Sequence, residues 1–490
     1  MSQTEVQLMY INGEWAKGEG GKAFETYNPT TGEVYATIAD ASVNDTKHAL
    51  EVAAAAQPAW AALPHTERMK YMNKIADIMD SMVEEFTEAL VNETGSWLGK
   101  AGFETGVSPE EFRAAAAMVF QANGEILPSA GGKTSLLVRK PIGVVTVISP
   151  WNFPSVLSAR GVAPALALGN TVVLKPSEES PVSGGILFAK ACEKAGLPAG
   201  VFNLVTCSRD NVVGVGEELV ANPVVKAISF TGSTAVGKQI GARAGGLLKK
   251  ACLELGGKDA IIVLEDADIG LAVNAATFGS FMHQGQICMS TERVIVHKDV
   301  VDEFSKRFAA NVSKLQSGDP WDITKPIGPI INKKQLDQIV DQVEDAKSKG
   351  AKVLVGGTHD GLFYNATVLS NVTNDMKIIQ NENFGPVAPI IIADDLEHAI
   401  KLHNECEYGL SSSVITADVA KGLEVANKLE AGMTHINDST VNDEPHVPFH
   451  GVKSSGLGGH GGSASIAAFT ELQWVTITKD AHYPPFFEES

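Results

Sequence analysis

The sequence predicts an α/β protein with two parallel-sheet domains and a small additional β element. Short runs rich in Val and Ile alternate with segments long enough for helices, first from about residue 143 and again from about residue 258. This alternation is typical of βαβ units, in which helices cover both faces of a parallel sheet. The length of 490 residues points the same way, because it exceeds what one ordinary core encloses.

The composition excludes several classes of protein. With 44% apolar and 20% charged residues, the chain is expected to fold rather than remain disordered. The formal net charge of −19 argues against nucleic acid or an anionic membrane as the main partner, although a local pocket can still bind an anionic cofactor. The N-terminal segment lacks the basic and apolar regions of a signal peptide, and no apolar run reaches the roughly 18 residues of a membrane span.

The cysteines indicate a reducing compartment. Their odd number, wide spacing and lack of CxxC pairs fit neither a disulfide framework nor a zinc site. We therefore expect a cytoplasmic protein without a structural metal. The five are Cys192, Cys207, Cys252, Cys288 and Cys406.

The N-terminal part of the chain predicts short strands and a long helix. Residues 8–40 contain turn-forming clusters and are expected to form short strands. Residues 66–92 are expected to form a helix, because apolar residues recur every three to four positions. We interpret this stripe as core. It consists of Met69, Met72, Ile75, Met79, Met82, Phe86 and Leu90.

The first alternating series predicts where a ligand binds. Ligands of parallel α/β sheets sit beyond the carboxyl ends of the strands. The loops at 149–154, 175–179 and 231–237 are therefore expected to lie together at a binding site. The strands of this series are expected at 143–149, 171–175, 201–205 and 227–230.

The second series predicts another α/β domain with its own core. Two further segments, 133–141 and 470–478, fit neither domain and resemble exposed strands. Because bare strand edges tend to be paired, we expect these two to pair with each other and then with a second subunit. The second domain is expected to contain strands at 259–264, 293–297, 387–393 and 411–416 and helices at 268–281, 299–316 and 333–349.

Cys288, in the stretch SFMHQGQICMS, is a candidate nucleophile. A thiol attacks a carbonyl group once it has become a thiolate. The nearby Gly285 is expected to allow a ligand to approach the backbone closely. The backbone N–H of Cys288 can donate to the oxyanion formed by such an attack. The alternative is a small buried residue at a helix end.

Two further residues have side chains suited to the same chemistry. Asn152, in ISPWNFP, offers an amide donor for an oxyanion, a contact worth roughly 3 kcal/mol. Its alternative role is to shape the turn before Pro154. Glu254, in LELGGKD, is expected to act as a general base with a raised pKa. Alternatively, it is simply one of 58 acidic residues.

Three loops are candidates for binding a dinucleotide. Lys175 and Glu178 share one loop, where the carboxylate can accept both ribose hydroxyls and repel a 2′-phosphate; alternatively, they form a surface ion pair. Gly232 and Ser233 precede a predicted helix, whose N-terminal N–H groups can hold a pyrophosphate. The first strand–helix turns contain no GxGxxG fingerprint, which disfavours an ordinary Rossmann mode of nucleotide binding.

The loop NENFGPV completes this set of candidates. Glu382 supplies a carboxylate for a nicotinamide ribose, and Phe384 supplies a ring that can support the nicotinamide. The alternative is that both residues only shape a Gly-Pro turn.

Six motifs in this order and spacing resemble the NAD(P)-dependent aldehyde dehydrogenase superfamily. They are PWNFP, KPSE, FTGS, LELGGK, GQIC and ENFGP, within a resemblance that runs from INGEW at 11–15 to the C-terminal strand. The resemblance implies that Cys288 attacks an aldehyde and that Asn152 and the Cys288 N–H form the oxyanion hole. It also implies that Glu254 activates the water that hydrolyses the resulting thioester.

The resemblance also implies a cofactor and its binding residues. NAD is expected because of Glu178, with NADP as a possible second cofactor. The implied cofactor-binding residues are Ser149, Trp151, Lys175, Ser177, Glu178, Gly232, Ser233, Leu255, Glu382 and Phe384.

The fold implied by the resemblance has three parts: a Rossmann-like cofactor domain, an α/β catalytic domain and oligomerisation strands. Members are homodimers or homotetramers. The implied bounds are 1–126 and 144–254 for the cofactor domain, 255–446 for the catalytic domain, 127–143 and 469–490 for the oligomerisation strands, and 447–468 for a return segment to the cofactor domain.

The C-terminal segment 436–466 resembles the branch of the superfamily that acts on aromatic aldehydes. Phe153, Met282 and Phe449 correspond to positions lining the substrate tunnel, and an apolar tunnel suits a ring. The sequence departs from the family pattern at His450 and Gly459, where glycine and arginine are expected, and in the loop TCSRDN, which lacks glycines. His450 is expected to narrow the substrate mouth or alter subunit contacts, and contacts from TCSRDN to adenine are in doubt.

Three alternative functions remain at this point. A CoA-acylating member is disfavoured because a water-activating Glu254 does not help when a thiol is the acceptor. A semialdehyde-specific member needs cations at the substrate mouth, and 440–450 contains no cationic cluster. A catalytically silent protein on the same fold is disfavoured by the intact set of Cys288, Asn152 and Glu254.

Overall fold

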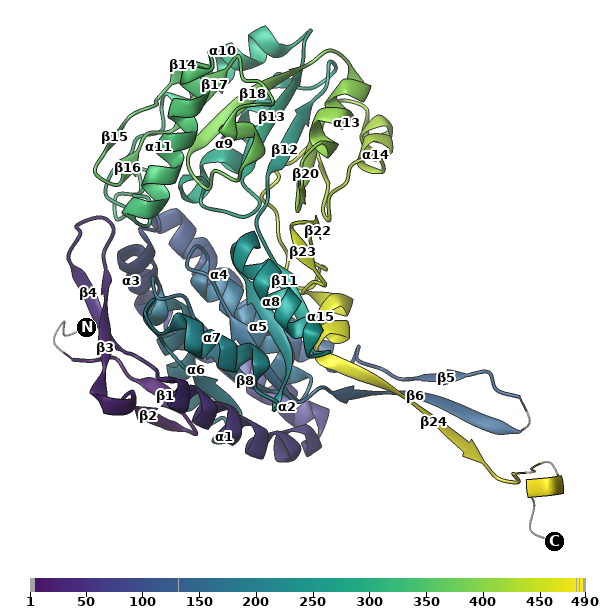
Figure 1. The fold of residues 1–490 in the computed structure, drawn as a ribbon. Helices are drawn as coiled ribbons and strands as arrows, with labels where there is room; N and C mark the ends of the chain where they lie inside the picture. The colour runs from purple at the N-terminus through teal and green to yellow at the C-terminus, as the bar shows by residue number, and fades with distance from the viewer. Residues whose placement is uncertain (1–4, 131, 482, 484, 488–490) are drawn as a thin grey trace.

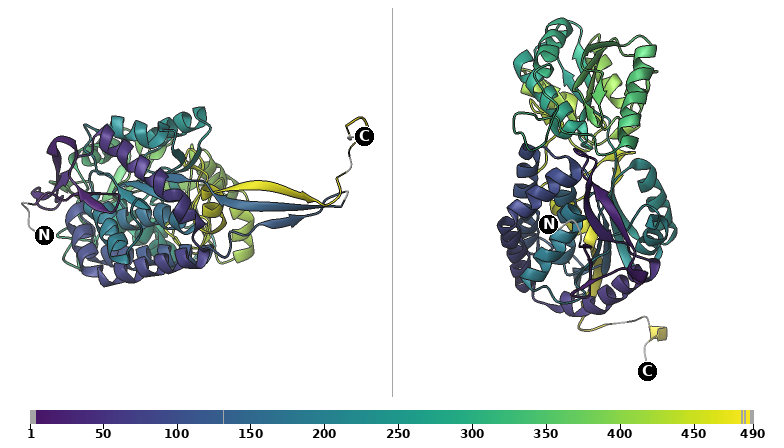
Figure 2. Two further views of the ribbon diagram at one scale, coloured as in Figure 1. Left: turned by 90° about the horizontal axis from the view of Figure 1, so that it is seen from below. Right: turned by 90° about the vertical axis from the view of Figure 1, so that its left-hand side faces the viewer.

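The chain forms two α/β lobes and a long arm that projects from one of them (Figure 1). The computed structural model describes residues 5–130, 132–481, 483 and 485–487. The predicted ranges 1–126, 127–143 and 469–490 therefore include a few positions outside the described residues. Figure 2 shows the arm extending away from both lobes when the molecule is seen from below. Within the described residues, no helix is long and apolar enough to cross a membrane.

The first lobe is built on an eight-stranded sheet with the order β2-β1-β9-β8-β7-β10-β11-β23. Its five central strands are parallel, as the Val- and Ile-rich runs predict, and their bounds agree within a few residues. Antiparallel β1 and β23 pair with β9 and β11. The strands are β1 (Met9–Ile11), β2 (Glu14–Ala16), β7 (Val144–Ile148), β8 (Thr171–Lys175), β9 (Phe202–Leu204), β10 (Val225–Thr231), β11 (Lys250–Glu254) and β23 (Gly456–Leu457).

Helices pack around this sheet and form its core. Within the Met-rich stripe, all residues except the half-buried Met69 are buried, which confirms the stripe as core. The predicted helical segment 66–92 is helical except at Met82, where the backbone leaves the helical region and divides the segment into α2 and α3. The helices are α1 (Val43–Ala62), α2 (His65–Ser81), α3 (Val83–Thr94), α4 (Leu98–Met118), α5 (Pro154–Ala167), α6 (Leu187–Ala195), α7 (Val212–Ala221) and α8 (Thr234–Gly246), with a π turn at Val182–Ile186.

The second lobe has a seven-stranded sheet with the order β14-β17-β18-β13-β12-β20-β21. Its two faces are covered by separate apolar clusters, so the predicted second core is confirmed. The strands are β12 (Asp259–Val263), β13 (Thr291–His297), β14 (Lys352–Val355), β17 (Thr367–Ser370), β18 (Val387–Ala393), β20 (Ser412–Ile415) and β21 (His435–Ile436), and the helices are α9 (Ile269–Phe281), α10 (Val301–Val312), α11 (Lys333–Ser348), α12 (Lys377–Gln380), α13 (Leu396–Asn404) and α14 (Val419–Ala426).

The arm is the predicted pairing of the two orphan segments. β6 (Lys133–Pro141) and β24 (Thr470–Thr478) are antiparallel over their full lengths, from Pro141 opposite Thr470 to Lys133 opposite Thr478. β5 (Glu125–Leu127) adds a third strand along β6. The predicted contact of this arm with a second subunit stays a prediction.

Short elements complete the fold. They are β3 (Ala23–Tyr27), β4 (Val34–Ala39), β15 (His359–Asp360), β16 (Phe363–Tyr364), β19 (Tyr408–Gly409), β22 (Val452–Lys453) and α15 (Gly462–Phe469), with 3-10 turns at Glu19–Gly21, Met282–Gly285 and Pro485–Phe487. The pairing of β23 with β11 places Gly456 opposite Glu254. The C-terminal segment therefore returns to the edge of the first sheet beside a candidate catalytic residue.

Candidate active site

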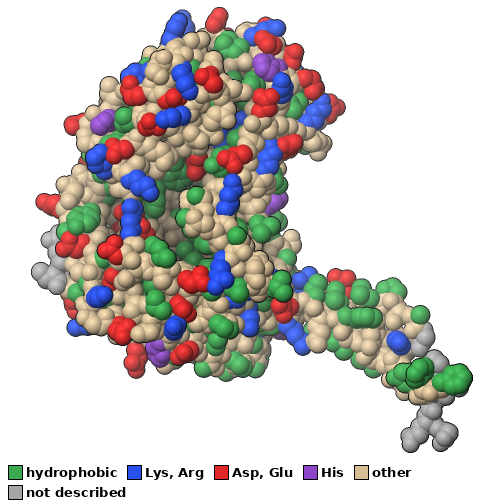
Figure 3. Space-filling view, viewed as in Figure 1, with side chains coloured by type: hydrophobic (Ala, Val, Ile, Leu, Met, Phe, Trp, Pro, Cys, Tyr) green, Lys and Arg blue, Asp and Glu red, His purple; other side chains and the backbone are tan. Residues whose placement is uncertain are grey.

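A cleft of about 310 Å³ contains residues from both lobes. The molecular surface is hollowed between the lobes in the same region (Figure 3). Cys288 contributes to the cleft from the loop between α9 and β13, and Asn152 contributes from the loop after β7. Of the predicted site residues, the cleft is lined by Trp151, Asn152, Gly232, Ser233, Leu255, Cys288, Glu382 and Phe384.

Four predicted cofactor-binding residues lie outside the lining of this cleft. Ser149 is buried, and its hydroxyl shares a hydrogen bond of 2.7 Å with the Ser158 hydroxyl. Lys175 and Ser177 are also buried, at the end of β8. Glu178 does not line the cleft, but it forms an ion pair with Arg209, which does. The cofactor-binding roles of these four residues stay predictions.

The loop that carries Cys288 depends on close backbone contacts. Gly285 has a φ of +69°, and a Cβ there would lie 2.1 Å from the carbonyl oxygen of Gly385. A Cβ on Gly257 would lie 2.2 Å from the carbonyl oxygen of Cys288 itself. The expectation that Gly285 makes room for a ligand is wrong, because its close neighbour is the loop of Gly385. Both glycines instead allow three backbone segments to meet under the thiol.

Cys288 is partly exposed in the cleft, and the charges of several carboxylates act on its thiol. Burial and the charge of Asp259 raise the pKa of this thiol above its usual range, and Arg160 opposes them in part. Carboxylates of Glu254 and Glu382 add to the increase in its pKa. In the free protein the sulfur is therefore a neutral thiol at neutral pH, and its proton must leave before it can attack a carbonyl.

Asn152 is fixed beside the loop of Cys288, the predicted nucleophile. Its side-chain Nδ2 donates a hydrogen bond of 3.0 Å to the carbonyl oxygen of Gln286, two residues before Cys288. An amide nitrogen has two hydrogens, so one remains beyond this bond. This position suits the predicted role of an oxyanion donor.

Glu254 ends β11 and is directed into a buried polar cluster. Its Oε1 lies 2.5 Å from Nδ1 of His460, and its Oε2 lies 3.6 Å from Nη1 of Arg160. Burial would raise the pKa of this carboxyl, but His460 and Arg160 outweigh burial and hold the pKa below its usual value. The expectation of a raised pKa for Glu254 is wrong, because the sequence did not show these two cations.

The buried cluster contains residues that sequence reasoning missed. Arg160 of α5 forms an ion pair with Asp443, and its Nε lies 3.6 Å from Oε1 of Glu111 on α4. The available signal was a single arginine in the otherwise uncharged segment 154–167. The segment 440–450 was found to contain no cationic cluster for a semialdehyde carboxylate. In the structure the guanidinium of Arg160 reaches Asp443 of this segment, but the carboxylates of Asp443 and Glu111 balance its charge.

Apolar side chains adjoin Cys288 and form one small cluster. Phe153, Met282 and Phe449, the three predicted substrate residues, all belong to it. Two cations flank the aromatic rings: Nζ of Lys100 lies 4.3 Å from the centre of Phe153, and Cζ of Arg160 lies 4.4 Å from the centre of Phe449. Cys288 therefore contacts an apolar cluster and also lines the cleft.

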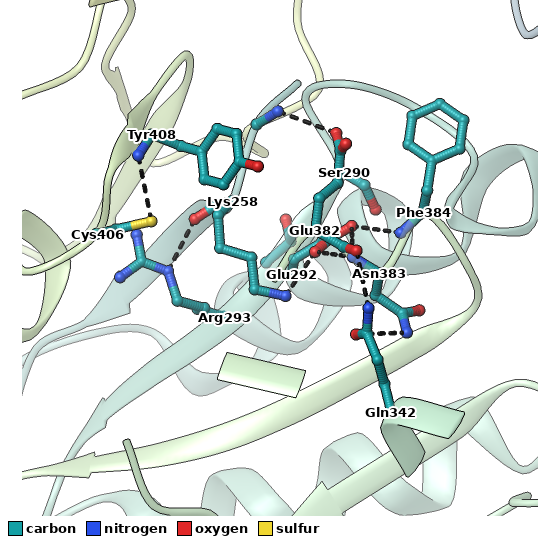
Figure 4. Close-up of polar contacts among 12 residues, drawn as sticks. Lys258, Ser290, Glu292, Arg293, Gln342, Glu382, Asn383, Phe384, Cys406 and Tyr408 are labelled. Carbon is teal, nitrogen blue, oxygen red and sulfur yellow. Dashed lines mark hydrogen bonds and ion pairs between the residues drawn. The ribbon is translucent and has the colours of Figure 1, made fainter. Parts of the chain in front are cut away.

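The loop 382–384 is fixed by hydrogen bonds from several elements (Figure 4). The carboxylate of Glu382 accepts a bond of 3.0 Å from the Gly257 N–H. Burial, together with the charge of Glu292, raises the pKa of Glu382 to about 8. The ring of Phe384 meets Trp151 edge-on at 5.5 Å. From α11, Gln335, Gln338 and Gln342 donate to the backbone carbonyl groups of this loop.

Glu292 is the central acceptor in this arrangement and was also missed from the sequence. Its carboxylate accepts the N–H groups of Asn383 and Phe384, each with a contact of 2.7 Å, and the ammonium of Lys258 at 2.6 Å (Figure 4). Glu292 and Lys258 are both buried. The adjacent charges Glu292 and Arg293 at the start of the otherwise apolar strand TERVIVH were the signal for it.

Arg209 connects the loop TCSRDN to the predicted ribose site. Its guanidinium donates to Glu178 at 2.8 Å and to Glu179 at 2.6 Å. Nζ of Lys175 lies 3.7 Å from Glu178 on the other side. Burial would raise the pKa of Glu178, but Lys175 and Arg209 hold it below its usual value. The loop that lacks glycines therefore supplies a cation to the cleft.

The two departures in the C-terminal segment lie away from Cys288. His450 and Gly459 line a separate hollow of about 740 Å³ between β10, β11 and α15. A Cβ on Gly459 would lie 2.6 Å from the carbonyl oxygen of Phe449, so the arginine expected here would require a local shift. The expectation that His450 narrows the mouth near Cys288 is therefore wrong. Its effect on subunit contacts stays a prediction.

Comparisons with known proteins match nearly the whole chain. A model described as the aldehyde dehydrogenase family matches residues 15–475. Benzaldehyde dehydrogenase [NAD(+)] of Pseudomonas putida is 44% identical, over 99% of this chain and 100% of its own length. Vanillin dehydrogenase of an Amycolatopsis species is 46% identical, over 97% of each chain. The crystal structure of a salicylaldehyde dehydrogenase from Pseudomonas putida G7 with salicylaldehyde superimposes with a TM-score of 0.96 at 40% identity, covering 98% of this chain and 100% of the other.

Proposed function

The chain belongs to the aldehyde dehydrogenase family, and from this premise we propose that it oxidises aromatic aldehydes to carboxylic acids with NAD, using Cys288 as nucleophile. One observation carries the proposal: Cys288 lines the interlobe cleft and also contacts the apolar cluster. Such a sulfur can meet a cofactor on one side and an aldehyde on the other.

The aromatic substrate class is supported by the walls of the apolar cluster. Phe153 and Phe449 offer ring surfaces next to Cys288, and Met282 adds a flexible apolar side chain. A flat aromatic ring can pack against such walls with its aldehyde carbon directed at the sulfur. The benzaldehyde, vanillin and salicylaldehyde dehydrogenases among the relatives point to the same class.

The first chemical step is attack by Cys288 on the aldehyde carbon. The thiol proton passes to water in the cleft, the sulfur–carbon bond forms, the π bond of the carbonyl group breaks and its oxygen becomes an oxyanion. Asn152 is held next to this position by its bond to Gln286, so its remaining N–H can donate to the oxyanion without rearrangement. The backbone N–H of Cys288 is the second proposed donor.

The cleft residues fit a nicotinamide cofactor. Glu382 offers a carboxylate at the rim, and the crossed rings of Trp151 and Phe384 leave an aromatic surface beside it. The N-terminus of α8, beginning after Ser233, directs N–H groups at the same cleft, where a pyrophosphate can bind. When bound, the nicotinamide ring supplies the hydride acceptor for the oxidation, which leaves a thioester on Cys288.

Glu254 is proposed as the base that releases the acid. It takes a proton from water while the water oxygen bonds to the thioester carbon, and the carbon–sulfur bond then breaks to free Cys288. Its lowered pKa keeps it ionised at neutral pH, as a base must be. In this structure its carboxylate contacts the buried cluster, so it must turn toward Cys288 to act.

NAD is proposed as the preferred cofactor because Glu178 would repel a 2′-phosphate. Arg209 weakens this preference, because its guanidinium donates a hydrogen bond to the Glu178 carboxylate and can itself pair with a phosphate. Use of NADP is therefore the second candidate, and comparing the two cofactors tests it.

The remaining alternatives are less well supported. Glu254 as a water-activating base argues against a CoA-acylating enzyme. Arg160 is the cation that a semialdehyde carboxylate would need, but Asp443 and Glu111 already balance its charge. A catalytically silent protein would have no need for Asn152 fixed beside Cys288.

The projecting arm supports a homodimer or homotetramer. Large apolar side chains on it are exposed, among them Ile126 at 79%, Trp474 at 68% and Ile477 at 53%. A second subunit would cover these side chains and the strand edges. The oligomer can be measured by light scattering of the wild type and of a Trp474→Glu variant, which we expect to dissociate. A monomeric wild type would contradict this proposal.

We also propose the domain division and the compartment. The first sheet would belong to the cofactor domain, 1–126 with 144–254, except for β23, which lies in the return segment 447–468, and the second sheet would belong to the catalytic domain, 255–446. Free thiols at all five cysteines support a reducing cytoplasm. Fractionation of cells that produce the protein tests the location, and secretion of the native chain would contradict it.

The proposed function is tested by measuring how fast NAD or NADP is reduced in the presence of each aldehyde of a panel. The panel contains benzaldehyde, vanillin and salicylaldehyde, aliphatic aldehydes and a semialdehyde, each with NAD or NADP. We expect the highest kcat/KM for an aromatic aldehyde with NAD. No turnover with any aldehyde would support the silent alternative, and a preference for the semialdehyde would contradict the aromatic proposal.

A further inference from the structure

His460 lies between Glu254 and Ser229 in the buried cluster. Its Nδ1 is 2.5 Å from Oε1 of Glu254, and its Nε2 is 2.9 Å from the Ser229 hydroxyl. The exposed fraction is 1% for the His460 side chain and 2% for that of Glu254. With both ring nitrogens in contact and no solvent around them, the imidazole has a fixed orientation.

The backbone brings these residues together from opposite ends of the chain. Glu254 ends β11, and β23 pairs with that strand beside it. His460 follows β23 and exchanges backbone hydrogen bonds with Phe449 at 2.8 and 3.0 Å. The backbone of His460 thus fixes that of Phe449, a proposed substrate contact.

Charged groups face the Glu254–His460 pair from several elements. Arg160 on α5 is the second cation, and Glu111 on α4 and Asp443 in the loop after β21 are the other acids. Cys252 on β11 contacts Nδ1 of His460 at 3.6 Å, and Cys288 is within electrostatic range of Glu254. Burial raises the pKa of Glu111 to about 8 and raises that of Asp443, so Glu254 is the acid of the cluster whose pKa is lowered.

His460 is the cation nearest to that carboxylate. Burial opposes its protonation, but Cys252 and Glu254 raise the pKa of the imidazole well above its usual value. The protonated ring therefore donates one hydrogen bond to Glu254 and another to Ser229. Arg160 lies more than 1 Å further from Glu254, at 3.6 Å against 2.5 Å.

We propose that His460 is a positioning residue for Glu254: as a cation it keeps this carboxylate ionised and fixes the buried position from which it turns to activate water. The inference rests on the proposed function, in which Glu254 is the base for thioester hydrolysis. It assigns to His460 no contact with the aldehyde or the cofactor. Loss of His460 should therefore slow hydrolysis of the acyl-enzyme and leave its formation unchanged.

The test isolates hydrolysis by acylating Cys288 without a cofactor. With 4-nitrophenyl benzoate, the sulfur takes the benzoyl group, 4-nitrophenolate leaves, and water then releases benzoate. Rapid acid quenching and intact-mass measurement follow the benzoyl-enzyme as a function of pH. The proteins compared are the wild type, His460→Gln and the matched control His403→Gln. His403 is also a buried histidine, but it lies on α13 and contacts Asn404.

The expected result concerns the acidic limb of the pH profile, that is, the pH range in which the rate of benzoyl-enzyme hydrolysis falls as Glu254 becomes protonated. This limb should shift in the variant. Glutamine can still donate to Glu254 but carries no charge, so the limb should move up by roughly one to three pH units in His460→Gln. With NAD and benzaldehyde, the same variant should show a burst of reduced nicotinamide followed by a slow steady state. His403→Gln should keep the wild-type limb and show no new burst.

Other outcomes distinguish the inference from the proposed function. A folded His460→Gln with the wild-type pH limb overturns the inference, while aldehyde oxidation by the wild type leaves the proposed function intact. If His460→Gln does not fold, the wild type alone decides. Its acidic limb should lie below about pH 5, because an ordinary glutamate titrates at about 4.3, and a limb at about pH 5 or above overturns the inference. Absence of both aldehyde oxidation and a benzoyl adduct on Cys288 overturns the proposed function itself.

Discussion

The side-chain amide of Asn152 donates to the carbonyl oxygen of Gln286 at 3.0 Å, so a loop of the first lobe is tied to the loop that carries Cys288 in the second. The bond is buried and spans 134 residues of sequence. It sets the position of the proposed oxyanion donor relative to the proposed nucleophile before any substrate arrives. Preorganised donors of this kind need no rearrangement during the reaction.

Replacing Asn152 by alanine removes this donor. We expect kcat for benzaldehyde to fall by about 10²–10³, the usual loss for one oxyanion-hole donor. The dissociation constant of NAD should stay unchanged, because the side chain acts on the aldehyde. Steady-state kinetics and a binding titration measure the two effects. A kcat within a few-fold of the wild type would remove Asn152 from the mechanism.

Replacing Glu292 by glutamine should weaken both the protein and its cofactor site. The variant leaves Lys258 as a buried charge without its partner, a change that costs about 3–5 kcal/mol of unfolding free energy. It also loosens the loop of Glu382 and Phe384, so the dissociation constant of NAD should increase. Denaturant unfolding and NAD titration measure these effects. The matched control is Glu303→Gln, whose exposed pair with Arg307 is worth less than about 1 kcal/mol, and equal losses in both variants would refute the account.

Replacing Arg209 by alanine should make the enzyme more selective for NAD. The guanidinium neutralises Glu178, and without it the carboxylate repels a 2′-phosphate more strongly. We expect the ratio of kcat/KM for NADP to that for NAD to fall roughly tenfold, which corresponds to about 1.4 kcal/mol. Arg243→Ala, which removes an exposed arginine paired with Glu217, is the control and should leave the ratio unchanged. A higher ratio in Arg209→Ala would show that Arg209 does not assist the phosphate.

The rate at which Cys288 reacts with an alkylating agent should increase only at high pH, because the pKa of its thiol is raised. Burial, with Asp259, disfavours the thiolate, so alkylation by iodoacetamide in the free protein should be slow at pH 7. The rate should still rise beyond about pH 9.5, where an ordinary thiol with a pKa of about 8.5 is almost fully ionised and its rate levels off. Peptide mapping of Cys288 after timed alkylation measures it, with the partly exposed Cys406 as an accessibility reference. A plateau reached below pH 8 would mean that the pocket activates the thiol without a ligand.

Regular secondary structure was predictable because its signals are local. The strand runs 171–175 and 387–393 correspond to β8 and β18, since a buried parallel strand needs continuous apolar residues. The break at Met82 was not predictable, because the apolar stripe continues through it and both flanking helices face the same core.

Contacts between distant segments limited what the sequence could predict about the site. Motif order placed Asn152 and Cys288 together, and the structure brings them into one cleft. The direction in which the pKa of Glu254 shifts depends on His460, which lies 206 residues away in the sequence. The ion-pair partner of Arg160 is Asp443, which lies 283 residues away. Neither pair leaves a spacing signal, so only the fold reveals that the pKa of the Glu254 carboxyl is lowered.

The central claim, that Cys288 carries the acyl group, is tested by trapping that group during turnover. The enzyme is mixed with NAD and benzaldehyde, quenched in acid within the first turnovers and digested for mass analysis. The account predicts one benzoyl group on the peptide that contains Cys288, more of it in Glu254→Gln, and neither adduct nor reduced nicotinamide in Cys288→Ala. Oxidation of benzaldehyde by Cys288→Ala at the wild-type rate would contradict the account.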